Sequence, residues 1–522
     1  MREKLIQRQI RVFNIVLIAM ILIMMAVFVY AKDGLHPDEV MSFESANAYG
    51  NVGRLYDTLY SGDNVWVSKQ DVRDAVTVGR ADLFDFSTAM SYSYADFNPP
   101  LYRILLHLVS ALKMGTISKW MGCGLNMLFL LGTLILLVRF SGDVLDRPKM
   151  APYCIAIYGF SVGAITGVLI VKPYMMVSFS VFWTLYEHAL FFTRNYKKRS
   201  SVRLFLSIVL GMLTQFYFTI FLLALISVYM LLCVFSEGKK EWKQYFLPAV
   251  LGVLTGGLLI VISDFLYNRD VHMAITLWQK LAEIDWRVSP FEFVLLYLKN
   301  VFGNEYLGFV FLAFFAAVGL SCLFMRKLRV DRNTFRLPAL MLLPTFVYLL
   351  FPLASAACYS DRYLLSTFPI LLVLMVWGID EMLHLLPMKG MRRQWIISIG
   401  LCILVLPGIV FYNSEYLMPG SSAKEEIAAD YEDFPSVFVG DDIYGNITEM
   451  MHFSYTMTAT PEVLYRIKDD ALLARSEGIV LMTTENMPDF DIIDYLNRGY
   501  GYQNYDVLME SADGTKYYFL SK

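Results

Sequence analysis

Two adjacent carboxylates, Asp38 and Glu39, follow the first long apolar run of the chain, residues 12–31. Carboxylates at a membrane boundary are costly to desolvate, so a chain that keeps them there usually has a use for them. In a partly desolvated cleft, a carboxylate can act as a general base that removes a proton from a hydroxyl group. The structural alternative is that Asp38 is the N-cap of a helix over residues 39–49, which would end at Gly50.

Two cations stand beside tyrosines at the ends of apolar runs. Lys172 and Tyr174 belong to a very short connection between two runs, and Arg362 and Tyr363 open a later one. Cations gathered at a membrane boundary can hold a phosphate group, with tyrosine hydroxyls as further donors. Taken singly, each cation is more often a snorkelling or ion-paired residue, and Asp361 is an obvious local partner for Arg362.

A short amphipathic stretch follows Asn98 and two prolines. Its leucines recur at helical spacing on one face of residues 101–113, while Arg103 and His107 fall on another face. At about fourteen residues it is too short to span a bilayer, so we expect an interfacial helix beside Asp38. A plain membrane-surface helix would show the same pattern.

The composition indicates which class of protein must position these groups. Of 522 residues, 57% are hydrophobic and only 17% are charged, which is too apolar for a soluble enzyme and typical of a polytopic membrane protein. The net charge of -3 provides no basic surface for nucleic acid. The histidines and cysteines have no local metal-ligand spacing, so the sequence assigns no metal and no cofactor.

The apolar runs predict a mostly α-helical fold. About eleven membrane spans are expected, at residues 12–31, 118–138, 151–170, 173–193, 203–217, 218–235, 245–266, 306–325, 337–354, 363–386 and 394–412. The N-terminal segment and alternate loops hold more than half of the Lys and Arg residues: 139–150, 194–203, 236–244, 326–336 and 387–394. Basic loops are cytoplasmic, so the N-terminus is predicted inside. This requires the run 203–235 to be two spans, because a single span there would reverse the membrane orientation of every later loop.

Three segments are then expected outside the membrane, residues 32–116, 267–303 and 413–522. We expect two domains, a transmembrane domain over 1–412 and a small extracytoplasmic α/β domain over 413–522. In the second, the pattern predicts strands at 437–439 and 479–482, helices at 461–475 and 490–497, and a closing hairpin at Asp513-Gly514. Asp441 and Asp442 are more readily explained by a turn than by a ligand site.

The order of these motifs resembles the GT-C glycosyltransferases, and more closely the family 39 group that includes protein O-mannosyltransferases and aminoarabinose lipid A transferases. The resemblance covers about residues 1–410. It rests on Asp38-Glu39 after the first helix, a Pro-Pro-Leu-Tyr helix ending near a His, Lys172-Pro173-Tyr174, Gln215-Phe216-Tyr217 at a hairpin, and Arg362-Tyr363 opening a late span. The chain departs from the family's pattern at Asn98, Lys172 and Gln215, where His, Arg and His are common.

The resemblance implies an inverting glycosyltransferase of the cell envelope. It would move a sugar from a polyprenyl-phosphate donor to an acceptor hydroxyl of a protein, a lipid or a cell-wall glycopolymer at the outer face of the cell membrane. The roles it implies are catalysis for Asp38 and Glu39, donor-phosphate binding for Lys172, Tyr174, Arg362 and Tyr363, and a substrate cleft formed by Asn98, Tyr102, Arg103, His107, Gln215 and Tyr217.

Two other functions remain open from the sequence. A transporter or flippase for a polyprenyl-linked substrate would also need cations and aromatics near a lipid path, although many transporters show two related halves and no internal repeat stands out here. A membrane scaffold whose tail binds a partner would tolerate replacement of the outer Asp, Lys and Arg residues.

Overall fold

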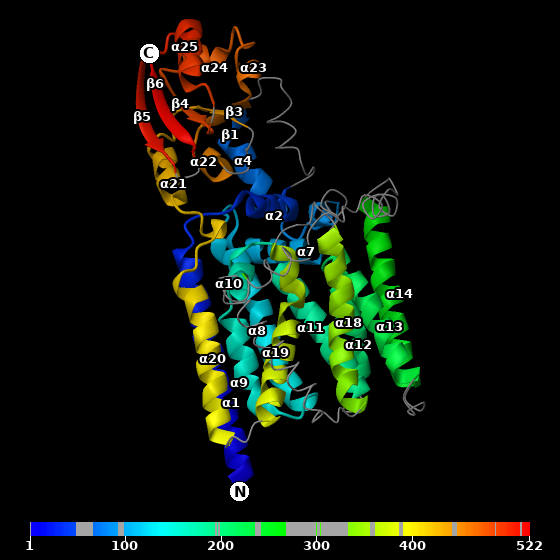
Figure 1. The fold of residues 1–522 in the computed structure, drawn as a ribbon. Helices are drawn as coiled ribbons and strands as arrows, with labels where there is room; N and C mark the ends of the chain where they lie inside the picture. Colours follow the sequence, from blue (N-terminus) through cyan, green and yellow to red (C-terminus); the bar gives the residue numbers. More distant parts are fainter. Residues whose placement is uncertain are drawn as a thin grey trace.

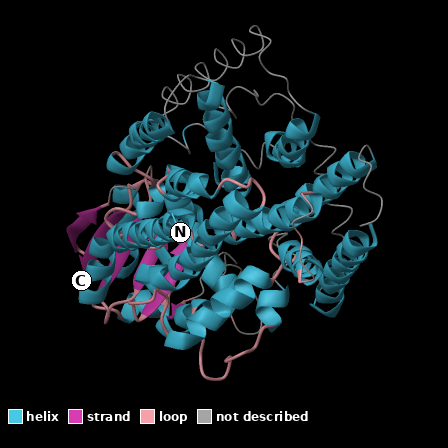
Figure 2. Ribbon diagram, turned by 90° about the horizontal axis from the view of Figure 1, so that it is seen from below, coloured by secondary structure: helices cyan, strands magenta, loops and turns pink. Residues whose placement is uncertain are grey.

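The computed structural model describes residues 2–48, 66–91, 99–193, 196, 199–234, 242–267, 299, 303, 332–354, 361–385, 390–440, 446–485, 487–511 and 514–522. Long helices form a bundle, and a mixed sheet with its own helices lies beyond one end of it (Figure 1). The N-terminus lies at the opposite end of the bundle, and the C-terminus lies in the sheet region. Seen from the N-terminal end, the strands lie behind one side of the bundle (Figure 2).

The bundle is built from the apolar runs of the sequence. Its helices are α1 (Arg2–Ala31), α8 (Lys119–Asp143), α9 (Ala151–Gly159), α10 (Val162–Leu169), α11 (Tyr174–Phe192), α12 (Ser200–Met212), α13 (Phe216–Val234), α14 (Trp242–Tyr267), α18 (Arg332–Ala354), α19 (Phe368–Leu385) and α20 (Gly390–Val410). Among the described residues, six helices are long and apolar enough to cross a membrane, or up to eight if two bent pairs each count as one span. The expected span at 306–325 lies outside the described residues.

Two of the expected spans meet at a turn, as the charge distribution predicted. Helix α12 ends at Met212 and α13 begins at Phe216, which divides the apolar run 203–235 and leaves Gln215 in the connecting turn. The division of this run is therefore confirmed, although the turn comes a few residues earlier than the expected boundary at 217.

The expected single span at 151–170 is instead two helices. The helix that ends at Gly159 and α10 meet at 58°. Ser161 is responsible for the break, because its hydroxyl donates to the Tyr158 carbonyl (2.6 Å) and accepts from Ala164 N–H (3.1 Å), which caps α10. The bent pair can still count as one span, and the bend itself was not expected because the apolar pattern continues through both halves.

Short helices cover the end of the bundle that faces the sheet (Figure 1). They are α2 (Pro37–Asn47), α4 (Lys69–Val76), α5 (Ser87–Ser91), α7 (Leu101–Ser110) with the 3-10 turn η1 (Ala111–Lys113), and the 3-10 helix η5 (Asp361–Thr367). At the other end, a further 3-10 turn, η2 (Pro148–Met150), precedes α9. The helix expected over 101–113 is confirmed as α7 and η1, and α7 packs against α2 and α8. Helix η5 packs against α10 and α11.

The sheet region follows α20. It contains η6 (Glu415–Leu417), α21 (Ser421–Asp430), β2 (Ser436–Val439), α22 (Ile447–Met450), β3 (Tyr455–Ala459), α23 (Pro461–Leu464), α24 (Ala471–Arg475), β4 (Gly478–Thr483), α25 (Asp489–Tyr500), β5 (Asn504–Glu510) and β6 (Lys516–Ser521). With β1 (Val67–Ser68), the strand order is β1-β3-β2-β4-β6-β5, where β2 is parallel to β3 and β4, and β6 is antiparallel to β4 and β5. The expected strands at 437–439 and 479–482 are confirmed as β2 and β4, which are buried throughout.

Other expectations for the tail met different outcomes. The helix expected at 490–497 lies within α25, and the expected hairpin is formed by β5 and β6. The helix expected at 461–475 is two short helices, because Asp470 accepts from Leu472 and Leu473 N–H (both 2.9 Å) and starts α24 anew. Asp441 and Asp442 lie outside the described residues.

The first strand of the sheet comes from the first loop of the chain. Strand β1 (Val67–Ser68) pairs antiparallel with β3, and the indole of Trp66 donates to Asp470 (2.9 Å). Lys69, the residue after β1, forms an ion pair with Glu432 (2.9 Å). The six-stranded sheet therefore joins two segments that the sequence keeps far apart.

Candidate active site

Helix α2 begins with a cap that does not use the Asp38 side chain. His36 is the N-cap residue: its Nδ1 accepts from Asp38 N–H (3.2 Å), and its own N–H donates to Glu39 Oε2 (2.7 Å). Pro37 occupies the first helical position, where its missing N–H costs nothing. The alternative in which Asp38 caps a helix over 39–49 does not hold, because His36 is the N-cap, and the Asp38 carboxylate is available for contacts across the bundle.

The Asp38 carboxylate forms an ion pair with the guanidinium of Arg362. The side chains are 28% and 25% exposed, so the pair can be reached from outside. Burial alone would raise the pKa of Asp38, but the charges of Lys172 and Arg362 outweigh it and hold this pKa below its usual value. Asp38 is therefore an ionised, accessible carboxylate at neutral pH.

Glu39 faces the opposite way and is completely buried. Its Oε2 lies 2.9 Å from Lys32 Nζ, and its Oε1 accepts from Val171 N–H at 2.9 Å. With the bond from His36, two backbone N–H groups and one ammonium surround this carboxylate. A carboxylate so occupied can orient its neighbours but is badly placed to receive a proton from a substrate.

The connection between α10 and α11 carries Lys172 next to Asp38. Its backbone N–H donates to Ile170 (2.8 Å), and the preceding residue, Val171, is held by Glu39. The Lys172 side chain is half-buried, and its charge acts on the Asp38 carboxylate. In the described part of the chain, no hydrogen-bond acceptor is found for the Lys172 ammonium.

Four tyrosines pack edge to face beside Arg362. The rings of Tyr174 and Tyr217 each lie 5.7 Å from that of Tyr363, and Tyr217 lies 6.4 Å from Tyr348. The Arg362 guanidinium carbon is 5.8 Å from the centre of the Tyr363 ring. Tyr348 was missed in the sequence because nothing distinguishes it from other aromatics of an apolar span; its hydroxyl donates to the Tyr363 carbonyl (2.9 Å).

Two polar atoms at this place are buried without a hydrogen-bond partner among the described residues. They are Gln215 Oε1, two residues before Tyr217, and Arg362 Nε. A buried polar group without a partner is costly, and such groups often serve a ligand. The pair with Asp38 thus leaves one donor of Arg362 without a partner among the described residues, and Gln215 leaves one acceptor in the turn before Tyr217.

Tyr102 supports this cluster from α7. Its hydroxyl donates to Asn126 Oδ1 (3.3 Å) on α8, and Asn126 Nδ2 donates to the Ile170 carbonyl (2.6 Å). Tyr102 therefore acts on the connection that carries Lys172. Asn126 was missed because a single Asn in an apolar run gives no sign of its partner.

Arg103 and His107 belong to a different neighbourhood. Arg103 donates to the Ala89 carbonyl (3.3 Å), and His107 Nδ1 bonds the Ala46 carbonyl (3.0 Å) near the C-terminal end of α2. Ala46 is eight residues beyond Asp38, or about 12 Å along the helix. His107 therefore lies towards the other end of α2 from Asp38, Arg103 contacts α5, and Asn98 lies outside the described residues.

Lys32 is a further member of the cluster that the sequence did not reveal. A lysine directly after an apolar run normally extends to water, yet the Lys32 side chain is fully buried between Glu39 and the Tyr416 carbonyl. Its two partners are a side chain seven residues away on α2 and a carbonyl 384 residues away in η6, and nothing in the local pattern indicates that they enclose it.

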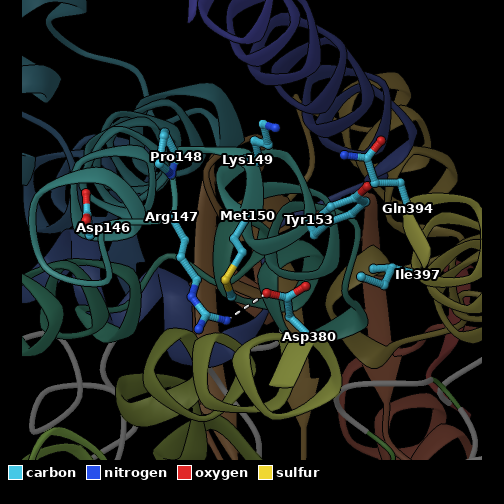
Figure 3. A pocket seen from close by; sticks show the side chains of 9 residues that line it. All are labelled: Asp146, Arg147, Pro148, Lys149, Met150, Tyr153, Asp380, Gln394 and Ile397. Carbon is cyan, nitrogen blue, oxygen red and sulfur yellow. Dashed lines mark hydrogen bonds and ion pairs between the residues drawn. The ribbon is translucent and has the colours of Figure 1, made fainter. Parts of the chain in front are cut away.

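A cavity of about 310 Å³ lies at the opposite end of the bundle. It is lined by Asp146, Arg147, Pro148, Lys149, Met150, Tyr153, Asp380, Gln394 and Ile397 (Figure 3). Arg147 pairs with both Asp380 (2.8 Å) and Glu381, which cancels its charge. The cavity therefore lacks the excess positive charge that a phosphate would need, and it is separate from the Asp38 cluster.

Comparisons with known proteins give a likeness in structure alone. No family model and no curated protein matches the chain. The structure is similar to the crystal structure of ArnT from Cupriavidus metallidurans bound to undecaprenyl phosphate, with 12% identity, a TM-score of 0.59 and 97% of each chain covered. The apo state of the same ArnT matches at 14% identity and a TM-score of 0.53, again over 97% of each chain. The chain therefore has a GT-C-like fold along almost its full length.

Proposed function

We propose that this protein is an inverting glycosyltransferase that moves a sugar from a polyprenyl-phosphate donor to an acceptor hydroxyl at the outer face of the membrane. One observation carries the proposal: an accessible ionised carboxylate, Asp38, is paired with a cation, Arg362, beside a second cation, Lys172. The fold supports it, since a structure of similar fold holds undecaprenyl phosphate.

In this mechanism Asp38 is the general base. The acceptor O–H gives its proton to the Asp38 carboxylate while the acceptor oxygen bonds to the anomeric carbon of the sugar. The bond between that carbon and the phosphate oxygen breaks on the opposite side, and polyprenyl phosphate leaves. A single displacement of this kind inverts the anomeric centre. Glu39 takes part as a neighbour that fixes Asp38, because its own oxygens are occupied.

The leaving group requires positive charge where the phosphate oxygens gain negative charge. Lys172 and Arg362 are suited to this role, since Lys172 Nζ and Arg362 Nε have no acceptor among the described residues. Tyr174 and Tyr363 add hydroxyl groups and an aromatic wall. Because Asp38 lies beside Lys172 and Arg362, one bound donor could contact the base and both cations.

A transporter is less well supported. Transporters generally bind their substrate near the middle of the membrane, between halves that open to either side. The Asp38 cluster instead belongs to the end of the bundle that carries the short helices and the sheet (Figure 1). A site at one end suits chemistry with an acceptor that arrives from that side.

The test is to incubate purified protein with a panel of undecaprenyl-phosphate sugars and measure released undecaprenyl phosphate. We expect release from at least one sugar donor by the wild type, and a strong reduction in Asp38→Asn. Lys69→Ala serves as a control, because Lys69 is a cation of the same outer loop that lies away from the cluster. Release that is equal in the wild type and Asp38→Asn would refute the proposal.

A further inference from the structure

The Lys32–Glu39 pair is the most deeply buried ion pair of the described chain, with both side chains 0% exposed. Removing two charges from water costs about as much as their attraction returns, so such a pair adds little stability over an apolar pair of the same shape. Its two contacts of 2.9 and 3.2 Å nevertheless fix the relative position of the end of α1 and the start of α2. The pair is therefore better explained as a device that positions the end of α1 against the start of α2 than as a contribution to the stability of the fold.

The remaining bonds of the pair reach two further segments. Glu39 Oε1 holds Val171 N–H in the α10–α11 connection, and Lys32 Nζ donates to the Tyr416 carbonyl in η6. Asp33 reinforces the second link, because its Oδ2 accepts from Gly420 N–H (2.8 Å) at the start of α21. Four parts of the chain thus meet at one pair of charges.

Two of these parts carry residues of the proposed site. Glu39 directly follows Asp38, and Val171 directly precedes Lys172. We infer that Lys32 and Glu39 are positioning residues that hold the Asp38 carboxylate and the Lys172 ammonium at a fixed separation for the phosphate of the donor. This rests on the proposed function; neither residue touches substrate, and both act through their neighbours.

A positioning role makes a prediction that a general structural role does not. If the pair acts through Lys172, its effect on phosphate binding must disappear once Lys172 has been removed, because coupled residues give non-additive effects. A pair that only stabilises the fold would change affinity independently of Lys172.

The experiment is a double-mutant cycle on binding of undecaprenyl phosphate to the purified full chain in detergent. The pair is neutralised by Lys32→Met with Glu39→Gln, which keeps the shape and leaves an amide oxygen for Val171 N–H. Lys69→Met with Glu432→Gln is the matched control, since this ion pair has the same 2.9 Å length but is exposed. Each change is made with and without Lys172→Ala.

We expect Lys172→Ala to weaken binding roughly tenfold to a hundredfold, the value of one charged hydrogen bond. The neutralised pair should weaken binding in the wild type and add little in Lys172→Ala, while the control pair changes nothing. Glu39→Asp keeps the charge but is one methylene too short to reach Val171 and Lys32 together, so it should give the same coupled loss even if the double variant fails to fold.

The inference and the proposed function fail differently. Equal fold-losses in both backgrounds, or wild-type affinity in Glu39→Asp, would overturn the positioning role while lipid binding by the wild type still supported the function. A wild type that does not bind undecaprenyl phosphate would overturn the function and the inference together.

Discussion

Asp38 and Glu39 are neighbours in sequence with opposite environments. Successive side chains on a helix point about 100° apart, so one carboxylate turns to the accessible Arg362 and the other to the buried Lys32. In the proposed reaction, the acceptor proton therefore has one suitable destination, Asp38. The pair of carboxylates could be recognised in the sequence, but the difference between their environments also depends on Arg362, 324 residues from Asp38, and on Val171, 132 residues from Glu39.

The first prediction concerns Asp38 as the base. Asp38→Asn keeps the shape of the side chain, and the N-cap of α2 is His36, so folded yield and thermal stability should change little. Loss of a general base should lower turnover by about 10² to 10⁴ at saturating donor and acceptor. Asp38→Asn enzyme that retains full turnover would remove Asp38 from the mechanism.

The second prediction concerns the charge beside Asp38. Nearby cations favour the ionised carboxylate, so its pKa is depressed and the base is active above that pKa and lost as the pH falls through it. Removing one cation in Lys172→Met should raise the pKa of Asp38 and move the acidic limb of the activity profile to higher pH. The measurement is kcat/KM from about pH 2.5 to 8 for both enzymes, because the acidic limb of the wild type lies below the ordinary aspartate pKa of about 3.9. A limb that stays in place would show that the titrating group is not Asp38.

At the scale of elements, the connection between α10 and α11 is the part on which the site depends most. Apolar length and charge located α8, α11, α13 and the turn at Gln215 from the sequence alone. The bend before α10 could not be predicted, because the apolar pattern continues through it. The close approach of α8 to this connection could not be predicted either. It is possible because Gly122 has no side chain where Val171 packs against α8.

The third prediction uses that glycine. A Cβ on Gly122 of α8 would overlap the side chain of Val171, whereas a Cβ on Gly124 meets no heavy atom within 4 Å in the described part of the chain. Gly122→Ala should displace Val171 and with it Lys172, raising the KM for donor at a stability cost of about 1 to 3 kcal/mol. Gly124→Ala on the same helix should keep normal kinetics. Identical kinetics of the two variants would show that the position of Val171 does not matter.

At the scale of the whole molecule, the described connections lie at two opposite ends of the helix bundle. Asp146 to Met150 and Gln394, which belong to two of the loops expected inside, line the cavity of Figure 3, while α2 and the sheet lie at the other end (Figure 1). The sequence could predict this grouping because basic residues mark alternate loops. It could not predict that Val67 and Ser68 complete the sheet, since two residues are too short for any periodic signal. The domain boundary at residue 412 stays a prediction.

The fourth prediction assigns the two ends to sides of the membrane. Ala429 and Lys149 are both exposed, and each is replaced by cysteine in a cysteine-free background. In intact cells, a membrane-impermeant thiol reagent should label Ala429→Cys and should not label Lys149→Cys. Labelling of both positions after the membrane is opened is the control for reactivity. The reverse pattern in intact cells would invert the proposed orientation and move the Asp38 cluster to the cytoplasmic face.

The strand that the first loop gives to the sheet also sets an order of events during synthesis. Trp66 and Asp470, which join the two segments, are 404 residues apart. At about 5 to 20 residues per second, the ribosome needs roughly 20 to 80 s to reach the second after the first. For most of that interval β1 has no partner strand and Lys32 lacks the Tyr416 carbonyl, because Tyr416 and β3 are made only towards its end. A nascent chain therefore contains Asp38 and Lys32 early, but the hydrogen bonds around Lys32 can be completed only after Tyr416 has been made.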